Sequence, residues 1–262
     1  MFIRKPHPIM ILSIALLIHC AAMAASNTNI IADNQEVTYL RCLRAAADSA
    51  ESAMDMALRW ARLEGGNPAK HCQAVALREL GDFDASAALL EDLAEADGDL
   101  PLIKAELWSQ AGRVWIDAQD FEKAVIAFDQ SIALPNAPDS VYLDRAIVLA
   151  AMDRFWAAID DLNVYLDIHQ TDAFALTLRA SAYRHIGSLT LSLDDIVRAL
   201  EIEPANVNAW LERGIVMDAL GNDKGALESW MNVLELEPDS PAADIVRARI
   251  EATAVGGSEL GD

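Results

Sequence analysis

Cysteine, basic residues and long hydrophobic runs are all scarce in this sequence. Three cysteines among 262 residues are too few for a small fold held together by disulfides. Lys and Arg number 20 against 41 Asp and Glu, which gives a formal charge of −21. Because phosphate groups repel such a surface, we expect neither nucleic acid nor anionic membranes as general partners. The single long apolar run lies at the N-terminus, which excludes a polytopic membrane protein.

Hydrophobic residues, in contrast, are abundant. They make up 53% of the chain, so an extensive core can form and wholesale disorder is excluded. The length of 262 residues fits one large domain or two ordinary ones.

Residues 1–24 have the features of a secretory signal peptide. Arg4 and Lys5 precede an apolar run from Ile9 to Ile18, and Ala22-Met23-Ala24 has the small-residue pattern of a cleavage site. We therefore expect cleavage after Ala24 and export, to the periplasm. Removal of this segment would leave a chain with a formal charge of −23, because two basic residues and no acidic ones are lost with it.

Two alternatives to cleavage after Ala24 are disfavoured. An uncleaved membrane anchor is one, because the apolar run is short for a spanning helix. Attachment of lipid at Cys20 is the other, because a lipobox has a small residue just before its cysteine, and His19 stands there. After signal removal we expect no stable membrane insertion.

The chain from Ala105 to Ser240 consists of four repeats of equal length that align without a gap. The units are 105–138, 139–172, 173–206 and 207–240, a period of thirty-four. Each unit contains two stretches of helical periodicity separated by a short polar turn. Small residues recur at the eighth and twentieth positions, which lets two helices approach closely: Gly112, Ala146, Ala180 and Gly214, then Ala124, Ala158, Ser192 and Ala226. Large apolar residues recur at the twenty-fourth position: Phe128, Leu162, Ile196 and Trp230.

This period and pattern resemble the tetratricopeptide repeat. The resemblance implies an all-α, right-handed α-solenoid of about six helix hairpins plus a C-terminal capping helix. Residues 34–104 fit as two degenerate hairpins, Asn34–Gly66 and Asn67–Lys104, the second with an insertion at Gly98-Asp99-Leu100-Pro101. The remaining segments are an N-terminal segment at 25–33, a capping helix at 241–252 and a flexible tail at 253–262.

Cys42 and Cys72 are the two cysteines that follow the signal segment. They fall on the first helices of adjacent units, and the exported route allows oxidation, so we predict a disulfide between them. Two buried thiols are the main alternative. A zinc site beside His71 is a third, for which no further ligands stand at suitable spacing.

The concave face of such a solenoid is lined by first helices, and the resemblance places the binding groove there. On this chain the groove residues are Arg113, Leu143, Ile147, Phe174, Thr177, Ser181, Arg184 and Leu211. The Lys and Asn that clamp a terminal carboxylate in chaperone-binding members are absent from the corresponding positions. An apolar centre flanked by two lone cations, Arg113 and Arg184, would suit an extended peptide or an amphipathic helix. A groove without a ligand, or one filled by the protein's own tail, is the alternative.

Charged residues also recur with the period. Arg145 and Arg179 stand at the seventh position, and Asp161 and Asp195 at the twenty-third, which predicts ion pairs Arg145–Asp161 and Arg179–Asp195 within repeats. Independent solvation of each charge is the alternative. Trp156 stands at a position that usually faces outward on a second helix, either as an interface anchor or folded over the adjoining turn.

No catalytic constellation stands out in the sequence. There is no phosphate-binding glycine loop, no GxSxG and no HExxH, and no histidine pairs with a nucleophile. We expect no enzyme activity, cofactor or metal, and a non-catalytic exported scaffold that binds a protein or peptide. The alternatives are an envelope-biogenesis factor that delivers a hydrolase or secretion substrate, and an enzyme with a cryptic groove site.

Overall fold

The computed structural model describes residues 28–96, 98 and 100–258, in which all regular structure is α-helical. The chain divides into two units, residues 1–148 and 149–262, with the boundary inside helix α7. The predicted signal peptide, residues 1–24, lies outside the described residues.

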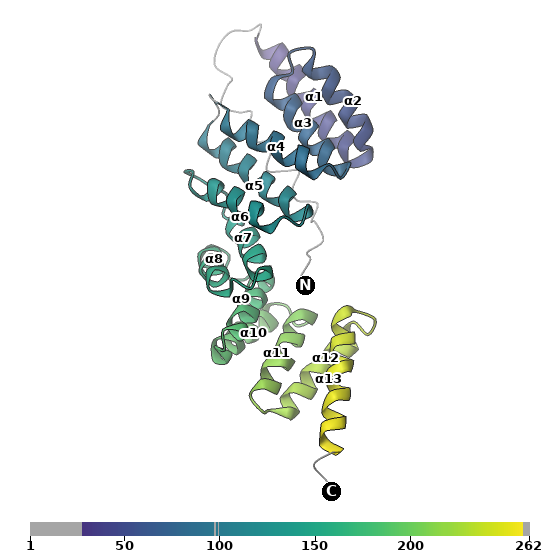
Figure 1. Cartoon of the computed structure of the whole chain (residues 1–262), viewed down its shortest axis with the longest axis vertical. Coiled ribbons are helices and arrows are strands. Elements are labelled where there is room, and N and C mark those ends of the chain that lie inside the picture. Colours follow the sequence, from purple (N-terminus) through teal and green to yellow (C-terminus); the bar gives the residue numbers. More distant parts are fainter. Residues whose placement is uncertain (1–27, 97, 99, 259–262) are drawn as a thin grey trace. The chain divides into compact units, whose positions relative to one another are not determined.

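The N-terminal unit consists of successive helix hairpins (Figure 1). These are α1 (Thr28–Asp48) with α2 (Ala50–Ala61), α3 (Gly66–Glu79) with α4 (Phe83–Glu95), and α5 (Pro101–Asp117) with α6 (Phe121–Ile132), followed by α7 (Ser140–Ala151).

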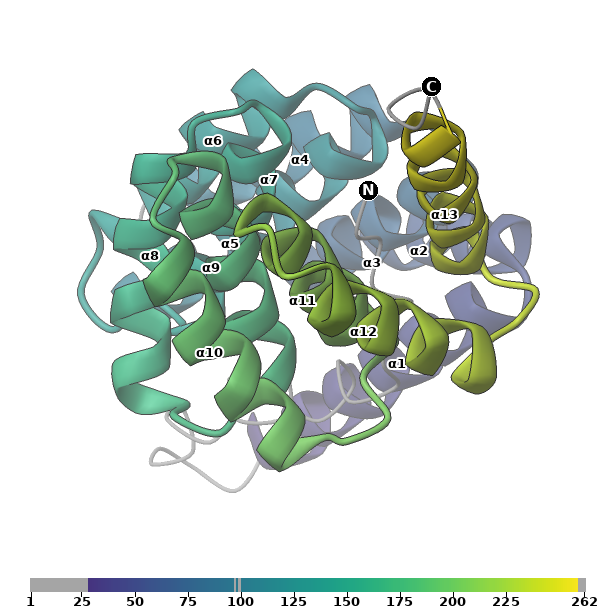
Figure 2. The ribbon, with the colours of Figure 1, turned by 90° about the horizontal axis from the view of Figure 1, so that it is seen from below.

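The C-terminal unit continues the pattern (Figure 2). It contains α8 (Phe155–Ile168), α9 (Ala173–His185) with α10 (Leu189–Ile202), α11 (Val207–Ala219) with α12 (Asp223–Leu236), and α13 (Pro241–Ser258). The fold is thus an all-α solenoid of helix hairpins with a C-terminal capping helix, as the repeat pattern predicts. Odd-numbered helices up to α11 are called first helices below, and even-numbered helices second helices.

Three helices depart from the expected boundaries. Helix α1 begins at Thr28, within the segment assigned outside the repeats, and α13 continues to Ser258, through part of the predicted flexible tail. Helix α5 begins at Pro101 rather than Ala105, because a proline is well suited to the first position of a helix. The predicted insertion therefore contributes a longer first helix as well as a loop.

Side-chain caps fix where many helices begin. Asp82, Asp120 and Asn222 accept hydrogen bonds from backbone N–H groups at the starts of α4, α6 and α12. Asp172 and Asn206 do the same for α9 and α11, and Ser240 for α13. Each cap satisfies a backbone donor that the first turn of a helix leaves free.

The turns of all hairpins after the first contain one residue in the left-handed region. The fifteenth residue of five units has a positive φ, from 57° to 81°: Gly81, Gln119, Asp153, Gly187 and Gly221. Glycine adopts this conformation without steric cost, and it occupies three of the five positions. A single left-handed residue therefore reverses the chain direction at the same position in each of these five repeats.

The crossing of the two helices depends on a complementary pair of side chains. A Cβ atom added to Gly112 of α5 would lie 2.5 Å from the ring of Phe128 on α6, and one added to Gly214 would collide with Trp230. Where the eighth residue is Ala rather than Gly, the twenty-fourth is Leu or Ile, which are smaller than Phe or Trp, as in Ala180 with Ile196. The two positions therefore fill a nearly constant volume.

The volume pairing makes a direct prediction for Gly112→Ala. The added methyl should destabilise the protein through overpacking against Phe128, by ~1–3 kcal/mol, offset by the ~1 kcal/mol that alanine contributes to helix propensity. In a Phe128→Leu background the clash is removed, so the same change should become neutral or stabilising. Urea denaturation of the four proteins in this double-mutant cycle measures the coupling, and additive effects would contradict the pairing.

Candidate functional site

Two pairs of neighbouring first helices, α5 with α7 and α9 with α11, are joined by side chains at the same offset along the repeat. The ninth residue of one repeat contacts the sixth residue of the next repeat, and in one case the twelfth residue contacts it as well. In α5 and α7 this contact joins Arg113 Nε to Asp144 Oδ2 at 2.7 Å. In α9 and α11 the Ser181 hydroxyl donates to Glu212 at 2.9 Å, while Arg184 Nε lies 2.7 Å from the other Glu212 oxygen.

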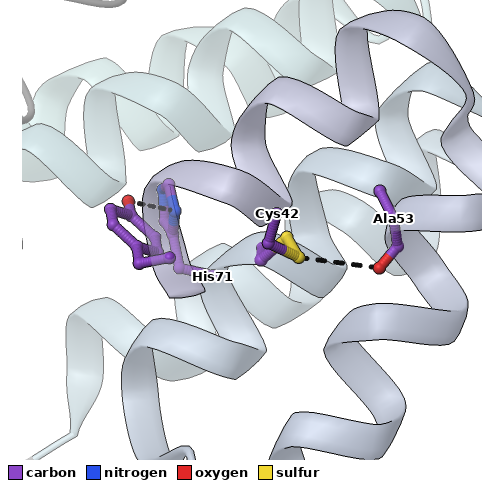
Figure 3. Close-up of a disulfide and its surroundings, with 5 residues drawn as sticks. Cys42, Ala53 and His71 are labelled. Atoms are coloured by element: carbon purple, nitrogen blue, oxygen red, sulfur yellow. Dashed lines mark hydrogen bonds between the residues drawn. A yellow bond between two sulfur atoms is a disulfide. The ribbon is translucent and has the colours of Figure 1, made fainter. Parts of the chain in front are cut away.

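At the N-terminal end the same link is covalent. Cys42 of α1 and Cys72 of α3 form a disulfide with Cα atoms 6.2 Å apart, and both side chains are fully buried (Figure 3). Cys42 is the ninth residue of the unit that begins at Asn34, and Cys72 the sixth of the unit that begins at Asn67. A disulfide here ties the first hairpin to the second.

A buried polar chain runs beside the disulfide. The Tyr39 hydroxyl lies 2.8 Å from His71 Nδ1, and His71 Nε2 lies 2.7 Å from Gln110 Oε1 (Figure 3 draws the first of these bonds). Gln110 in turn donates to Glu106 at 3.0 Å. Because an amide oxygen only accepts, Nε2 carries the proton and Nδ1 accepts from Tyr39.

The neutral form of His71 matches its surroundings. Burial lowers the pKa of His71, although the hydrogen bond to Gln110 and the charge of Glu106 act in the opposite direction. Burial, together with Glu106, raises the pKa of Tyr39. Both groups therefore stay uncharged near neutral pH and connect α1, α3 and α5 through hydrogen bonds.

The two cations predicted to be free in the groove are engaged within the protein. Besides Asp144, Arg113 has Glu106 at 3.8 Å, and Arg184 is paired with the buried Glu212. The expectation that they are isolated and available to a partner's carboxylate was wrong. The expectation was based on positions within single repeats, whereas the acids closest to the two arginines, Asp144 and Glu212, belong to the following repeats.

Half of the predicted groove residues are also buried. Leu143 is 4% exposed, Thr177 2%, Ser181 7% and Leu211 7%, whereas Ile147 and Phe174 are half-buried. Leu211 belongs to the core cluster that contains Ala243 and Val246 of α13. Thr177 and Ser181 lie on α9, which packs on α11, and Leu211 lies on α11, which packs on α13. The expectation that the four buried residues line an open groove was therefore wrong.

Within repeats, Arg179 and Asp195 form a bidentate ion pair, with N–O distances of 2.7 and 2.8 Å. Arg145 pairs with Asp129 of α6, in the preceding repeat. Its predicted partner Asp161 belongs to the other unit, and that pair stays a prediction.

The outward surfaces of the second helices in the C-terminal unit carry exposed apolar side chains. Trp156 of α8 is 69% exposed, Val197 of α10 is 48% and Met231 of α12 is 60%. Of these, only Trp156 stood out in the sequence as a candidate surface residue. Val197 and Met231 both occupy the twenty-fifth position of their repeats, and this recurrence could have identified them.

Metal sites and membrane-spanning helices are both missing from the described part of the chain. No group of three His, Cys, Asp or Glu side chains could hold a metal ion there. No helix in that part is long and apolar enough to span a bilayer.

Solved structures of other proteins identify the fold. No family model matches the sequence. YrrB, a TPR protein with an unusual peptide-binding site, superimposes with a TM-score of 0.60 at 16% identity, over 72% of this chain and 96% of its own. The chain has the tetratricopeptide-repeat fold. MamA from Desulfovibrio magneticus also resembles it, with a TM-score of 0.58 at 20% identity over 64% of this chain and 93% of MamA.

A curated relative matches this chain over a shorter stretch. Sperm-associated antigen 1 of Mus musculus is 33% identical over 88 residues, which is 33% of the chain. The chain spans about a tenth of the length of this relative. The comparison therefore concerns repeats rather than whole proteins.

The link between α9 and α11 generates a stability prediction. Arg184→Met should leave the Glu212 carboxylate, 4% exposed, without its cation, at a cost on the order of 3 kcal/mol. Arg247→Met is the matched control, because the pair Arg247–Asp244 is exposed and should contribute only ~0–1 kcal/mol. Equal losses in chemical denaturation would mean that Glu212 is solvated.

Proposed function

We propose that this protein is a non-catalytic scaffold that binds another protein or a peptide. The observation that carries the proposal is the exposure of large apolar side chains on successive second helices: Trp156, and Val197 and Met231 at one shared repeat position. Large apolar side chains that remain exposed at recurring positions of a repeat stack are suited to contact with another chain. The peptide-binding site named for YrrB supports the same use of this fold.

The stacking contacts described above also favour a binding role. Ionic, covalent and hydrogen-bonded links fix neighbouring first helices. Because second helices α10 and α12 pack on first helices α9 and α11, their backbones are held in place, which lowers the ordering cost of binding.

Direct capture tests the proposal. The tagged full-length protein is crosslinked in its own cells and purified, and each recovered protein is then made separately and titrated against it. We expect a protein that binds with fixed stoichiometry and retains binding without crosslinker. Recovery of a small molecule alone, with no protein that binds on titration, would refute the scaffold function.

We propose further that the protein acts after export, with Cys42 and Cys72 oxidised. The basic and apolar character of residues 1–18 and the small residues before Ala25 support export. The paired positions of the two cysteines on α1 and α3 support a disulfide.

Intact-mass measurement of protein from the envelope fraction tests both points. The mature chain should begin at Ala25 and should resist alkylation until a reductant is added. A chain that retains Met1, or two cysteines that react with the alkylating agent without reductant, would contradict export or oxidation respectively.

A further inference from the structure

We infer that the outward surface of α8, α10 and α12 docks a basic amphipathic helix of the partner protein. The inference rests on the proposed scaffold function and names the surface and the partner's chemistry. It replaces the groove as the binding site, since both groove arginines and half of the predicted groove residues are occupied in stacking.

The surface is defined by three rows of side chains that cross the three helices, and we call it the acidic face. Two rows consist of exposed carboxylates at the twenty-second and twenty-ninth positions of the repeats: Asp160, Asp194 and Glu228, then Asp167, Glu201 and Glu235. Between them, at the twenty-fifth position, lie Asn163, Val197 and Met231. The three rows share one face of each helix, since their positions are separated by three and then four steps along the chain.

This face points away from the core. The buried residues of α10 are Ser192, Asp195, Ile196 and Ala199, and those of α12 include Ala226, Trp230 and Val233. Both helices pack on α11, which lies between them in the chain. Because the rows recur at the same repeat positions, their side chains project in similar directions.

Spacing and charge fit a helix with a narrow apolar stripe. The carboxylate rows are two helical turns apart, or about 10 Å along a helix, which is close to the ~10 Å diameter of a helix. An apolar stripe could therefore rest on Val197 and Met231 while lysine or arginine side chains on either side reach the two rows.

The carboxylates are available for such contacts. Of the six, only Glu228 has a cation within ion-pair distance among the described residues, Arg213 at 3.8 Å. Met231 offers an adaptable thioether to an apolar partner surface. Trp156 lies one helical turn before Asp160 on α8 and supplies a large aromatic anchor at the end of the same stripe.

A model peptide tests the inference with purified full-length protein. The probe is a fluorescent helix of about 18 residues with a leucine stripe flanked by lysines. Fluorescence anisotropy should show binding at least about tenfold tighter than for a scrambled peptide of the same composition, and weaker binding at high salt. Equal binding of the scrambled peptide would overturn the inference, because it would reflect charge alone.

Paired variants locate the binding surface. Val197→Ser with Met231→Ser, and separately Asp194→Asn with Glu228→Gln, should each weaken peptide binding about tenfold or more. The control for the first is Leu220→Ser with Ile245→Ser, whose side chains are 51% and 46% exposed in the same unit. The control for the second is Asp223→Asn with Asp239→Asn, both exposed. Circular dichroism should show unchanged helix in all four.

The variants also separate this inference from the scaffold function. If the captured partner binds wild type and the acidic-face variants equally well, the scaffold function stands and the acidic face is refuted. If the acidic-face variants instead abolish self-association in sedimentation experiments, the occupant is a second copy rather than a basic partner helix, which also overturns the inference. Loss of both partner and peptide binding only in these variants is the expected result.

Discussion

Close approach of the two helices in each hairpin is the constraint on which the rest of the structure depends. It is set by the volume shared between the eighth and twenty-fourth residues, Gly112 with Phe128 and Gly214 with Trp230. At the crossing a small twentieth residue adds no bulk, and in two hairpins a serine there bonds a backbone carbonyl, as Ser192 does to Ala180. Hairpins of equal thickness can then stack at a constant offset.

That offset determines which side chains remain available for function. The ninth and sixth residues of neighbouring first helices contact one another, so Arg113 and Glu212 form contacts between repeats. Second helices contact the stack on one side only. In the C-terminal unit their other side carries carboxylates and apolar residues such as Met231 together. The binding role that we propose for the second helices therefore follows from how many first-helix side chains are used in stacking.

The repeat period predicted most of the fold but little of the site. Helix hairpins, small crossing residues such as Ala158 and the pairing positions of Arg179 and Asp195 all follow from comparing equivalent positions of successive repeats. The partners of Arg113 and Arg184 do not, because they depend on how far one repeat is displaced against the next. That displacement is set by packing between neighbouring repeats, so the residue pattern within a single repeat does not predict it.

At the N-terminal end, a disulfide joins the first two hairpins in addition to their packing. Two of its core clusters consist of small side chains, Ala46, Ala53 and Ala76 in one and Cys42, Ala57 and Cys72 in the other. A third contains the aromatic residues Tyr39 and Trp60. The C-terminal cluster contains Leu211, Trp230 and Val246. Small side chains bury less apolar area, so the first hairpin gains less from packing. A disulfide that closes a loop of this size contributes ~3 kcal/mol, which offsets that deficit. The covalent link therefore lies among small buried side chains, which on their own bury little apolar area.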